Sequence, residues 1–421
     1  MEGINFGTGA SKRSPGSSQP IKPASSSEEA QTNTSFSKSI DSADKISPQK
    51  PIEAPQSADR PVDAPKIETK VETLSSRHIV NLLFDLQLQP TKENRDIVTT
   101  MIKHGIPVTA DGVEVINTLV KGKKKGNALE SAVVALSKGL ASNSKSVDLL
   151  SSFFSSQLQF SEQLSELKGR LLQFQTGLGK FQSLFETGLF SGLSSIVSDL
   201  DEQLKKMSKK GSDDKIELSK FSREGLLTDL KAFSGFLAGI YKKLHRTHQQ
   251  SSLFQKFTAE LKSLQVGLSN LMNALTTQAI LSKSSQFHGL DDYAFFQVPN
   301  PLASEQSKKN INLLIRKNKR GSESKIEPDK TRLVIKFETP DLGEVAIIVD
   351  VADKKLWYTF QTKEGETKQV IMSMQKDLQD RMAAINYNVQ GVKTLLKKLD
   401  LKSLLLPTLD LDNMSRIQAE A

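Results

Sequence analysis

The sequence predicts a multidomain chain with a disordered N-terminal region, an all-α middle of long antiparallel helices, and an α+β C-terminal domain whose mostly antiparallel sheet is covered by a helix. Three observations support this fold class. Residues 1–74 are rich in proline and serine. Between 146 and 288 apolar residues recur every three or four positions, which is the helical period. From 331 to 360 apolar and polar residues alternate, which is the period of strands.

The N-terminal region, residues 1–74, holds eight of the fifteen prolines and only two aromatic residues, Phe6 and Phe36. This composition buries too little apolar surface to offset the loss of chain entropy on folding, so we expect a disordered lead. Its first residues lack the basic and apolar regions of a cleavable secretion signal. Two roles stay open for the lead: a linker with no role of its own, or an export or docking signal.

A small helical segment with a hairpin repeat is expected over 75–145. Thr91 and Thr109 each stand where an N-cap residue begins a helix. Gly105 and Gly122 stand where a left-handed residue ends one. The repeated spacing predicts short helical hairpins.

Residues 146–288 are expected to form a long-helix bundle or a coiled-coil-like region, since no proline occurs between Pro107 and Pro299. Breaks near 209–214 and 245–252 suggest three long antiparallel helices. The alternative is a two-helix or elongated coiled arrangement, because Gly177, Gly179, Gly188 and Gly192 can kink or interrupt the first helix. The recurring apolar positions include Leu167, Leu171, Phe174, Leu178, Phe181, Leu184, Leu226, Leu230, Phe233, Leu237, Ile240, Leu244, Phe257, Leu261, Leu264 and Leu268.

An α+β domain is expected over 289–400, followed by a flexible tail over 401–421. Pro340 to Gly343 suits a tight connection between two strands, because proline cannot donate a ladder hydrogen bond and glycine tolerates positive φ. A basic loop is expected over 317–327, a hairpin turn over 352–355, and one helix over 370–385 with its apolar stripe on the sheet. The expected strands are 293–298, 310–316, 332–337, 344–351 and 356–360.

Composition excludes several classes of protein. The chain has no cysteine, so it has no disulfides, thiolate metal sites or cysteine nucleophiles. No run approaches the roughly 20 apolar residues that a membrane-spanning helix requires, so membrane insertion is not expected. The net charge of +9 lies partly in lysine-rich patches such as 121–125 and 308–320, which permit acidic partners.

Motifs for nucleotide binding, for a nucleophile elbow and for a zinc protease are absent from the sequence. His245 and His248 have the spacing of metal ligands on one helix face, but no carboxylate lies near them in sequence, so a solvated helix end is expected. Asp341 and Glu344 flank the Pro-Gly turn and are expected to be solvated. We therefore expect a protein that is not an enzyme, with no catalytic residues, no cofactor and no metal.

Trp357 is the aromatic residue with the most specific placement. Trp357 and Tyr358 are adjacent on a strand and face opposite sides, so they cannot stack bases on one platform, and nucleic acid is not the expected partner. Two positions are open for Trp357: packed under the helix, or exposed as an anchor for a protein partner.

This order of strand, Pro-Asp-Leu-Gly turn, strand rich in valine and isoleucine, further strand and helix resembles the C-terminal domain of flagellar hook-length control proteins of the FliK type. The segments that carry the resemblance are 332–337, 340–343, 344–351, 356–360 and 370–388. The chain departs from the family in two ways. Its middle is helical rather than rich in proline, and its tail after Gly391 is rich in lysine and leucine rather than glutamine.

The resemblance implies an exported, non-enzymatic protein that controls hook length. It implies a lead that directs type III export, a middle that senses length, and a C-terminal domain that contacts the switch component of the export gate (FlhB type) to change the class of exported substrate. Hook and hook-cap proteins are further implied partners. The implied location is the cytoplasm before export, followed by secretion through the flagellar type III apparatus.

The candidate partner-binding residues are Pro340, Leu342, Gly343, Val345 and Trp357. The first four shape the turn that carries the resemblance, and Trp357 is the candidate anchor. The alternative interpretation is a cytoplasmic scaffold or nucleic-acid-binding protein that uses the lysine-rich patches, and it requires binding that weakens steeply as salt concentration rises.

Overall fold

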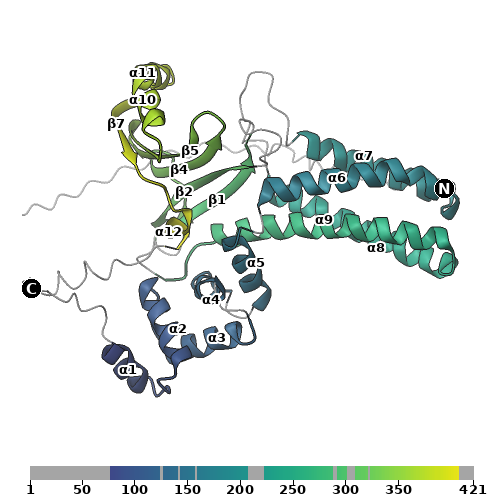
Figure 1. The fold of residues 1–421 in the computed structure, drawn as a ribbon, viewed down its shortest axis with the longest axis horizontal. Coiled ribbons are helices and arrows are strands. Elements are labelled where there is room, and N and C mark those ends of the chain that lie inside the picture. The colour runs from purple at the N-terminus through teal and green to yellow at the C-terminus, as the bar shows by residue number, and fades with distance from the viewer. Residues whose placement is uncertain are drawn as a thin grey trace, which may run out of the picture. The chain divides into compact units, whose positions relative to one another are not determined.

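A computed structural model describes residues 76–406 except 124–126, 141–142, 157–158, 207–221, 288–291, 301–308 and 321–322. The chain divides into two units, 1–68 and 69–421, and all described residues belong to the second unit. The disordered lead predicted over 1–74 lies outside the described residues. In the described part, helices come first along the chain, and a sheet with three short helices follows (Figure 1).

The first described segment is helical, as expected, and its predicted caps are confirmed. Thr91 Oγ1 accepts a hydrogen bond from Asn94 N at 3.2 Å, and Thr109 Oγ1 accepts one from Gly112 N at 3.1 Å. Gly105 and Gly122 have φ of +62° and +77°, in the left-handed region that ends a helix. The helices are α1 (Ser76–Asp85), α2 (Lys92–Lys103), α3 (Ala110–Val120), α4 (Asn127–Ser137) and α5 (Ser144–Phe154).

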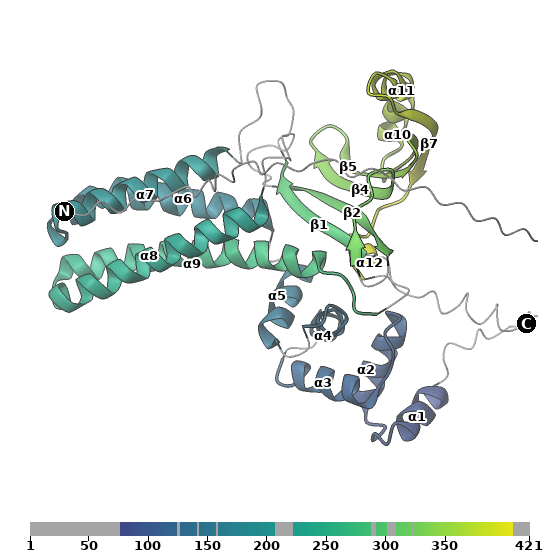
Figure 2. The same ribbon diagram turned by 180° about the vertical axis from the view of Figure 1, so that it is seen from behind.

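In the middle of the chain, the described residues form four α-helices that share one apolar core and run side by side (Figures 1 and 2). Every apolar position that the sequence analysis placed in the helical stripes is buried in this core. A short 3-10 helix, η1, lies between the first two helices. The elements are α6 (Phe160–Leu178), η1 (Gly179–Leu184), α7 (Thr187–Lys206), α8 (Arg223–His248) and α9 (Ser252–Ser282).

The prediction of three long helices is wrong for the first of them, because η1 interrupts it and it forms α6 and α7. The described residues do not form the alternative two-helix arrangement either. After η1, Phe185 is extended, with φ of −117° and ψ of 146°, and α7 returns along α6. Glycine weakens a helix by about 1 kcal/mol relative to alanine, and Gly177 and Gly179 stand at the break. Phe181 and Phe185 compensate by packing edge-on against Phe257 of α9, at ring-centroid distances of 5.4 and 5.3 Å. The break expected at 209–214 lies outside the described residues, whereas the one after His248 is confirmed.

The C-terminal sheet has the strand order β1-β2-β4-β5-β6-β7, with β3 paired to β2. All pairings are antiparallel except that of β6 with β7, which confirms a mostly antiparallel sheet. β5 and β6 meet in a two-residue turn with Asp353 and Lys354 at positive φ, as a tight hairpin requires. The strands are β1 (Asp292–Pro299), β2 (Asn310–Arg320), β3 (Glu323–Lys325), β4 (Lys330–Thr339), β5 (Gly343–Ala352), β6 (Lys355–Thr362) and β7 (Asn388–Leu396).

Three features of this domain differ from the sequence-based expectation. The loop expected over 317–327 is largely replaced by the end of β2 and by β3. β7 was not expected, because its mixed polar pattern becomes a strand only through pairing with β6. The helix expected over 370–385 is two helices, α10 (Gly365–Ser373) and α11 (Gln375–Ala383), that break at Met374 with φ of −91° and ψ of 4°. Ser373 Oγ donates to the Val370 carbonyl oxygen at 2.8 Å and so competes with the helical ladder there.

One face of the sheet is covered by α11, as the sequence predicted for its helix. Leu378 and Met382 of α11 pack against that face. Stripe residues Met374 and Ile385 do not, since 56% and 58% of these residues are exposed. The covered residues of the sheet are Val349, Val351, Leu356 and Tyr358.

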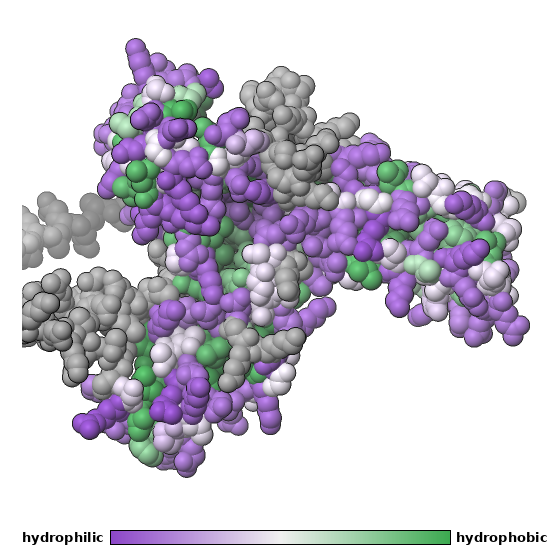
Figure 3. Space-filling model, viewed as in Figure 1, coloured by the Kyte–Doolittle hydropathy of each residue, from purple (hydrophilic) through white to green (hydrophobic). Residues whose placement is uncertain are grey.

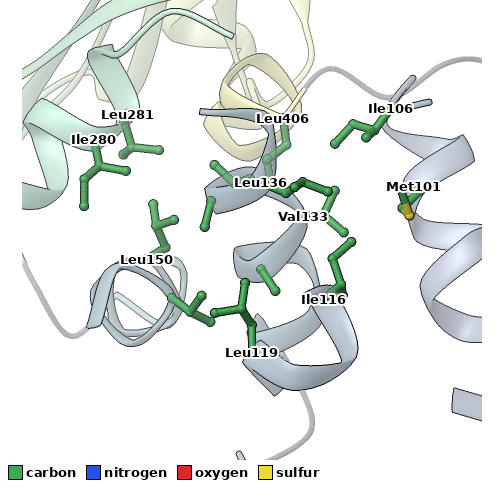
Figure 4. Close-up of a cluster of buried hydrophobic side chains, with 14 of the residues drawn as sticks. Met101, Ile106, Ile116, Leu119, Val133, Leu136, Leu150, Ile280, Leu281 and Leu406 are labelled. Atoms are coloured by element: carbon green, nitrogen blue, oxygen red, sulfur yellow. The ribbon is translucent and has the colours of Figure 1, made fainter. Parts of the chain in front are cut away.

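The opposite face of the sheet and the first helical segment contribute to one hydrophobic core, so residues 75–145 and 289–400 do not have separate cores. Figure 4 shows Ile280 and Leu281 of α9 and Leu406 near Leu136 of α4. The boundary expected between 145 and 146 falls inside α5, whose Val147, Leu149 and Leu150 belong to this core. The sheet contributes Tyr293, Phe295, Leu314, Val334 and Ala346.

The flexible tail expected over 401–421 is wrong for residues 401–406, because the helix α12 (Leu401–Leu405) and Leu406 pack on the shared core. Lys402 forms ion pairs and hydrogen bonds with α4 through Glu130 and Asn127, and its ammonium lies 5.7 Å from the ring centroid of Phe154. Lys336 of β4 donates to the Leu399 carbonyl oxygen at 3.0 Å. Residues 407–421 lie outside the described residues.

Polar side chains join the helices to β1, which is an edge strand of the sheet. Ser282 Oγ accepts from Phe295 N at 2.8 Å and donates to Phe295 O at 3.0 Å, and Gln278 Oε1 accepts from Gln297 N at 3.0 Å. Helix α9 therefore occupies the edge that an unpaired strand would leave open to other chains. A buried ion pair, Lys138 Nζ to Asp292 Oδ1 at 3.0 Å, ties α4 to the start of β1.

Candidate protein-docking site

The connection between β4 and β5 is a tight turn whose backbone is held from both sides. Thr339 Oγ1 accepts from Leu342 N at 3.0 Å within the turn. Thr367 Oγ1, at the start of α10, donates to the Leu342 carbonyl oxygen at 3.1 Å. Because Thr367 is only 2% exposed, the turn and the first helical turn of α10 form one packed unit. Pro340 and Asp341 are exposed on it.

Gly343 closes the turn, and its backbone conformation favours glycine there. Its φ is +63°, in the left-handed region that other residues rarely adopt. A Cβ atom at this position would lie 2.8 Å from Glu364 Oε1. The close approach brings Glu364, which immediately precedes α10, against the turn. The Pro-Asp-Leu-Gly sequence thus positions α10 as well as joining two strands.

Helix α10 exposes apolar side chains and buries only Thr367. Val370 is 41% exposed, and Met372 and Met374 are each 56% exposed. We call Pro340, Leu342, Val370, Met372 and Met374 the turn–helix surface. Figure 3 shows hydrophobic residues among hydrophilic ones at the end of the molecule that carries α10 and α11. Methionine side chains are flexible and polarisable, and exposed methionines are common on surfaces that bind proteins.

The structure separates the five residues that the sequence put forward for partner binding. Pro340 and Leu342 lie on the turn–helix surface, and Gly343 shapes its backbone. Val345 is only 3% exposed, so its side chain belongs to the interior. Trp357 lies in β6 opposite Asp350, seven residues along β5 from Gly343. At about 3.3 Å per residue it stands roughly 23 Å from the turn, on a separate surface.

Trp357 is exposed rather than packed under the helix, which decides between the two placements left open by the sequence. Strand alternation puts it on the face opposite Tyr358, and α11 covers the Tyr358 side. Forty per cent of Trp357 is accessible to solvent. Burial raises the pKa of the Tyr358 phenol.

Sequence reasoning missed the exposed residues of α10. It assigned Met374 to an apolar stripe facing the sheet, because it continued one helix through the break at that residue. The signal that pointed to the break is Ser373, whose side chain hydrogen-bonds the helix backbone. Val370 and Met372 were outside the predicted stripe, and their apolar character on a solvated helix face was the available clue.

The described residues hold no group of three or more His, Asp and Glu side chains that could bind a metal. His245 stacks on Tyr241 at a ring-centroid distance of 5.5 Å and an interplanar angle of 17°. None of the described helices has the length and apolar character needed to cross a membrane.

Comparison with known proteins gives one finding for this region. Residues 319–395 match the family model of the flagellar hook-length control protein FliK. The resemblance stated from the strand pattern is thereby confirmed for this segment, which runs from the end of β2 through β7 and includes the turn, α10 and α11. Hook-length control proteins are regulatory and non-enzymatic. No curated protein and no solved structure gives a significant match to the chain.

Proposed function

We propose that the chain controls flagellar hook length and switches the substrate specificity of type III export through contact of its C-terminal domain with the export gate. The observation that supports this is the match of 319–395 to the FliK family model. The matched segment presents a surface suited to protein contact, with Pro340, Leu342 and the exposed residues of α10 held in one unit.

In the proposed mechanism the protein is first exported, and its C-terminal domain then docks on the export gate. The lead directs export, and the middle senses hook length during transit. The turn–helix surface then contacts the switch component of the gate, which is of the FlhB type. Hook and hook-cap proteins are the other proposed partners, and the protein is exported through the flagellar type III apparatus. Exposed methionines can adapt their rotamers to a partner without rearranging the sheet beneath them.

The test replaces the native protein in motile cells with Met372→Glu/Met374→Glu. Glutamate is a good helix former, so α10 should persist while two exposed apolar positions, in α10 and at its C-cap, become anionic. We expect overlong hooks that carry no filaments, scored by electron microscopy of isolated hooks. The matched control is Leu172→Glu/Val266→Glu in the helical bundle, where 57% and 43% of the two residues are exposed. The control is expected to give hooks of native length with filaments.

Two outcomes would contradict different parts of the proposal. Normal hooks and filaments in a strain that lacks residues 331–388 would reject hook-length control itself. Normal hooks in Met372→Glu/Met374→Glu, together with a defect in the strain lacking 331–388, would reject the turn–helix surface as the docking site. Circular dichroism of each purified point variant checks that the fold is retained.

A further inference from the structure

A row of polar and aromatic residues crosses the sheet on the face opposite α11. The row follows the strand order. Tyr293 of β1 pairs with Arg316 of β2. Ile315 of β2 pairs with Leu333 of β4, so the next residues along these antiparallel strands, Arg316 and Arg332, stand beside each other. Arg332 pairs with Asp350 of β5, and Asp350 pairs with Trp357 of β6. The row ends at β7, where Trp357 pairs with Gly391.

Burial decreases along this row, from the shared core to solvent. Tyr293 is 5% exposed, whereas the side chains of Arg332 and Asp350 are 38% and 40% exposed. Trp357, the chain's single tryptophan, is exposed to a similar degree. Its indole leans toward β7, where a Cβ atom on Gly391 would lie 3.6 Å from Trp357 Cδ1. A large apolar side chain is thus presented on the open part of an otherwise covered face.

Of the two arginines in this row, Arg332 is held by its neighbours. Arg332 Nε donates to Asp350 Oδ1 at 2.6 Å. Hydrogen bonds to Asp350 and to Tyr293, partly offset by burial, raise the pKa of Arg332 above its ordinary value, so it stays cationic. Arg316 Nε is buried and has no hydrogen-bond partner. An anion placed over this row would meet the guanidinium of Arg332, which Asp350 already orders.

The surroundings of Trp357 are basic. Strand alternation places Lys330, Lys355 and Lys393 on the same face as Trp357, and all three are exposed. Among the described strand residues around Trp357 on this face, Asp350 is the one carboxylate, and it is paired with Arg332. Two further carboxylates, Asp329 and Asp353, lie in the turns at one end, joined by the hydrogen bond from Asp353 N to Asp329 O at 2.8 Å.

We propose that this face is a second docking surface, which binds an acidic segment of a protein partner with an apolar side chain seated against Trp357. Trp, Tyr and Arg are the residue types that most often carry binding energy at interfaces. Lysines around such an anchor select a partner of opposite charge and speed its association. The surface lies about 23 Å along the sheet from the turn–helix surface. It therefore goes beyond the function proposed above.

A protein segment is favoured over single-stranded nucleic acid for a geometric reason. Sequence-tolerant binding of nucleic acid stacks successive bases on several aromatic side chains. On the open part of this face Trp357 is the one described aromatic residue, since Tyr358 and Phe360 lie on the face that α11 covers. One ring suits one apolar side chain of a peptide.

The first test uses Trp357 as its own probe, because no other residue contributes tryptophan fluorescence. The quenching of Trp357 fluorescence in the full chain by iodide is compared with its quenching by caesium at equal ionic strength. Each quenching constant is divided by the one measured for free N-acetyltryptophanamide with the same ion. We expect iodide to quench at least about twofold more efficiently than caesium, since cations concentrate anions near the indole. Lys355→Glu/Lys393→Glu should reverse the preference. Equal quenching by the two ions in the native chain would overturn the proposal.

The second test titrates the full chain with the peptide Gly-Leu-Glu-Glu-Leu-Glu-Glu-Leu-Gly at low salt, followed by Trp357 fluorescence. We expect saturable binding that weakens by about tenfold in Lys355→Glu/Lys393→Glu, because each reversed charge both removes an attraction and adds a repulsion. The matched control is Lys231→Glu/Lys256→Glu, which makes the same change in net charge at exposed lysines of α8 and α9. The control should bind as the native chain does.

Three results of the peptide titration would also overturn the proposal. One is equal loss of binding in the control variant, which would show an effect of net charge alone. Another is equal binding of a peptide with glutamine in place of glutamate. The third is tighter binding of a twelve-nucleotide thymidine oligomer than of the peptide, which would assign the face to nucleic acid.

Discussion

The buried ion pair between Lys138 and Asp292 allows a sharp test of how the helices are attached to the sheet. Its N···O distance is 3.0 Å, and the two side chains are 8% and 1% exposed. Asp292 Oδ1 and Oδ2 also accept from Ser285 N at 2.8 and 3.0 Å. Replacing Asp292 with alanine therefore removes a carboxylate partner from a buried ammonium and an acceptor from the partly buried Ser285 amide.

The expected loss in the free energy of unfolding is large. Breaking a buried pair by removing one partner destabilises a protein by about 3–5 kcal/mol, because the remaining charge stays out of water. The pair between Lys243 and Glu186 is a natural control, with an N···O distance of 3.1 Å but side chains that are 56% and 80% exposed. Removing an exposed partner costs about 0–1 kcal/mol, so burial and not distance should decide the difference.

The assay is urea denaturation of Asp292→Ala and Glu186→Ala, followed by both far-ultraviolet circular dichroism and Trp357 fluorescence. Coincidence of the two signals establishes that the sheet and the helices unfold together. A double variant, Lys138→Met/Asp292→Leu, should recover most of the loss, since an apolar replacement of a buried pair is often neutral. Equal losses for the buried and the exposed variant would refute the reasoning.

Two further predictions concern the C-terminal domain. Gly343→Ala should lower the free energy of unfolding by about 1–2 kcal/mol, because alanine is strained at the positive φ of this position. Gly365→Ala should not destabilise the protein, because a Cβ atom there would meet nothing within 4 Å. The urea midpoints of the two variants are compared, and equal midpoints would contradict the strain at Gly343. Burial raises the pKa of Tyr358 in the folded state, so the unfolded chain loses its phenolic proton first, and stability falls as pH rises through about 10. Tyr358→Phe should therefore lose less stability than the native chain between pH 9 and 11. Parallel profiles of stability against pH for the two proteins would refute this.

Much of the C-terminal domain follows from local pattern. Alternating apolar residues determined β1, β2, β4, β5 and β6, because the side-chain period of a strand is independent of what it packs against. The hairpin at Asp353 and Lys354 and the positive φ of Gly343 also follow from local turn chemistry. In the helical part, Thr91 and Thr109 marked helix starts, since an N-cap needs only its own side chain and the next turn.

What the sequence could not supply were the interactions between distant segments. β7 is a strand because β6 pairs with it, and α12 is ordered because Leu406 enters a core formed by α4, α5 and α9. The single core beneath the sheet and the first helices also depends on tertiary packing, which no local period encodes.

The same division holds for the candidate sites. The sequence by itself determined that Pro340, Leu342 and Gly343 form a turn and that Trp357 faces away from Tyr358, because both follow from backbone geometry. Only the tertiary structure decided that Val345 is interior and that Met374 is exposed. It also decided that Trp357 stands beside Asp350 on an open face, since exposure depends on which elements cover each side of the sheet.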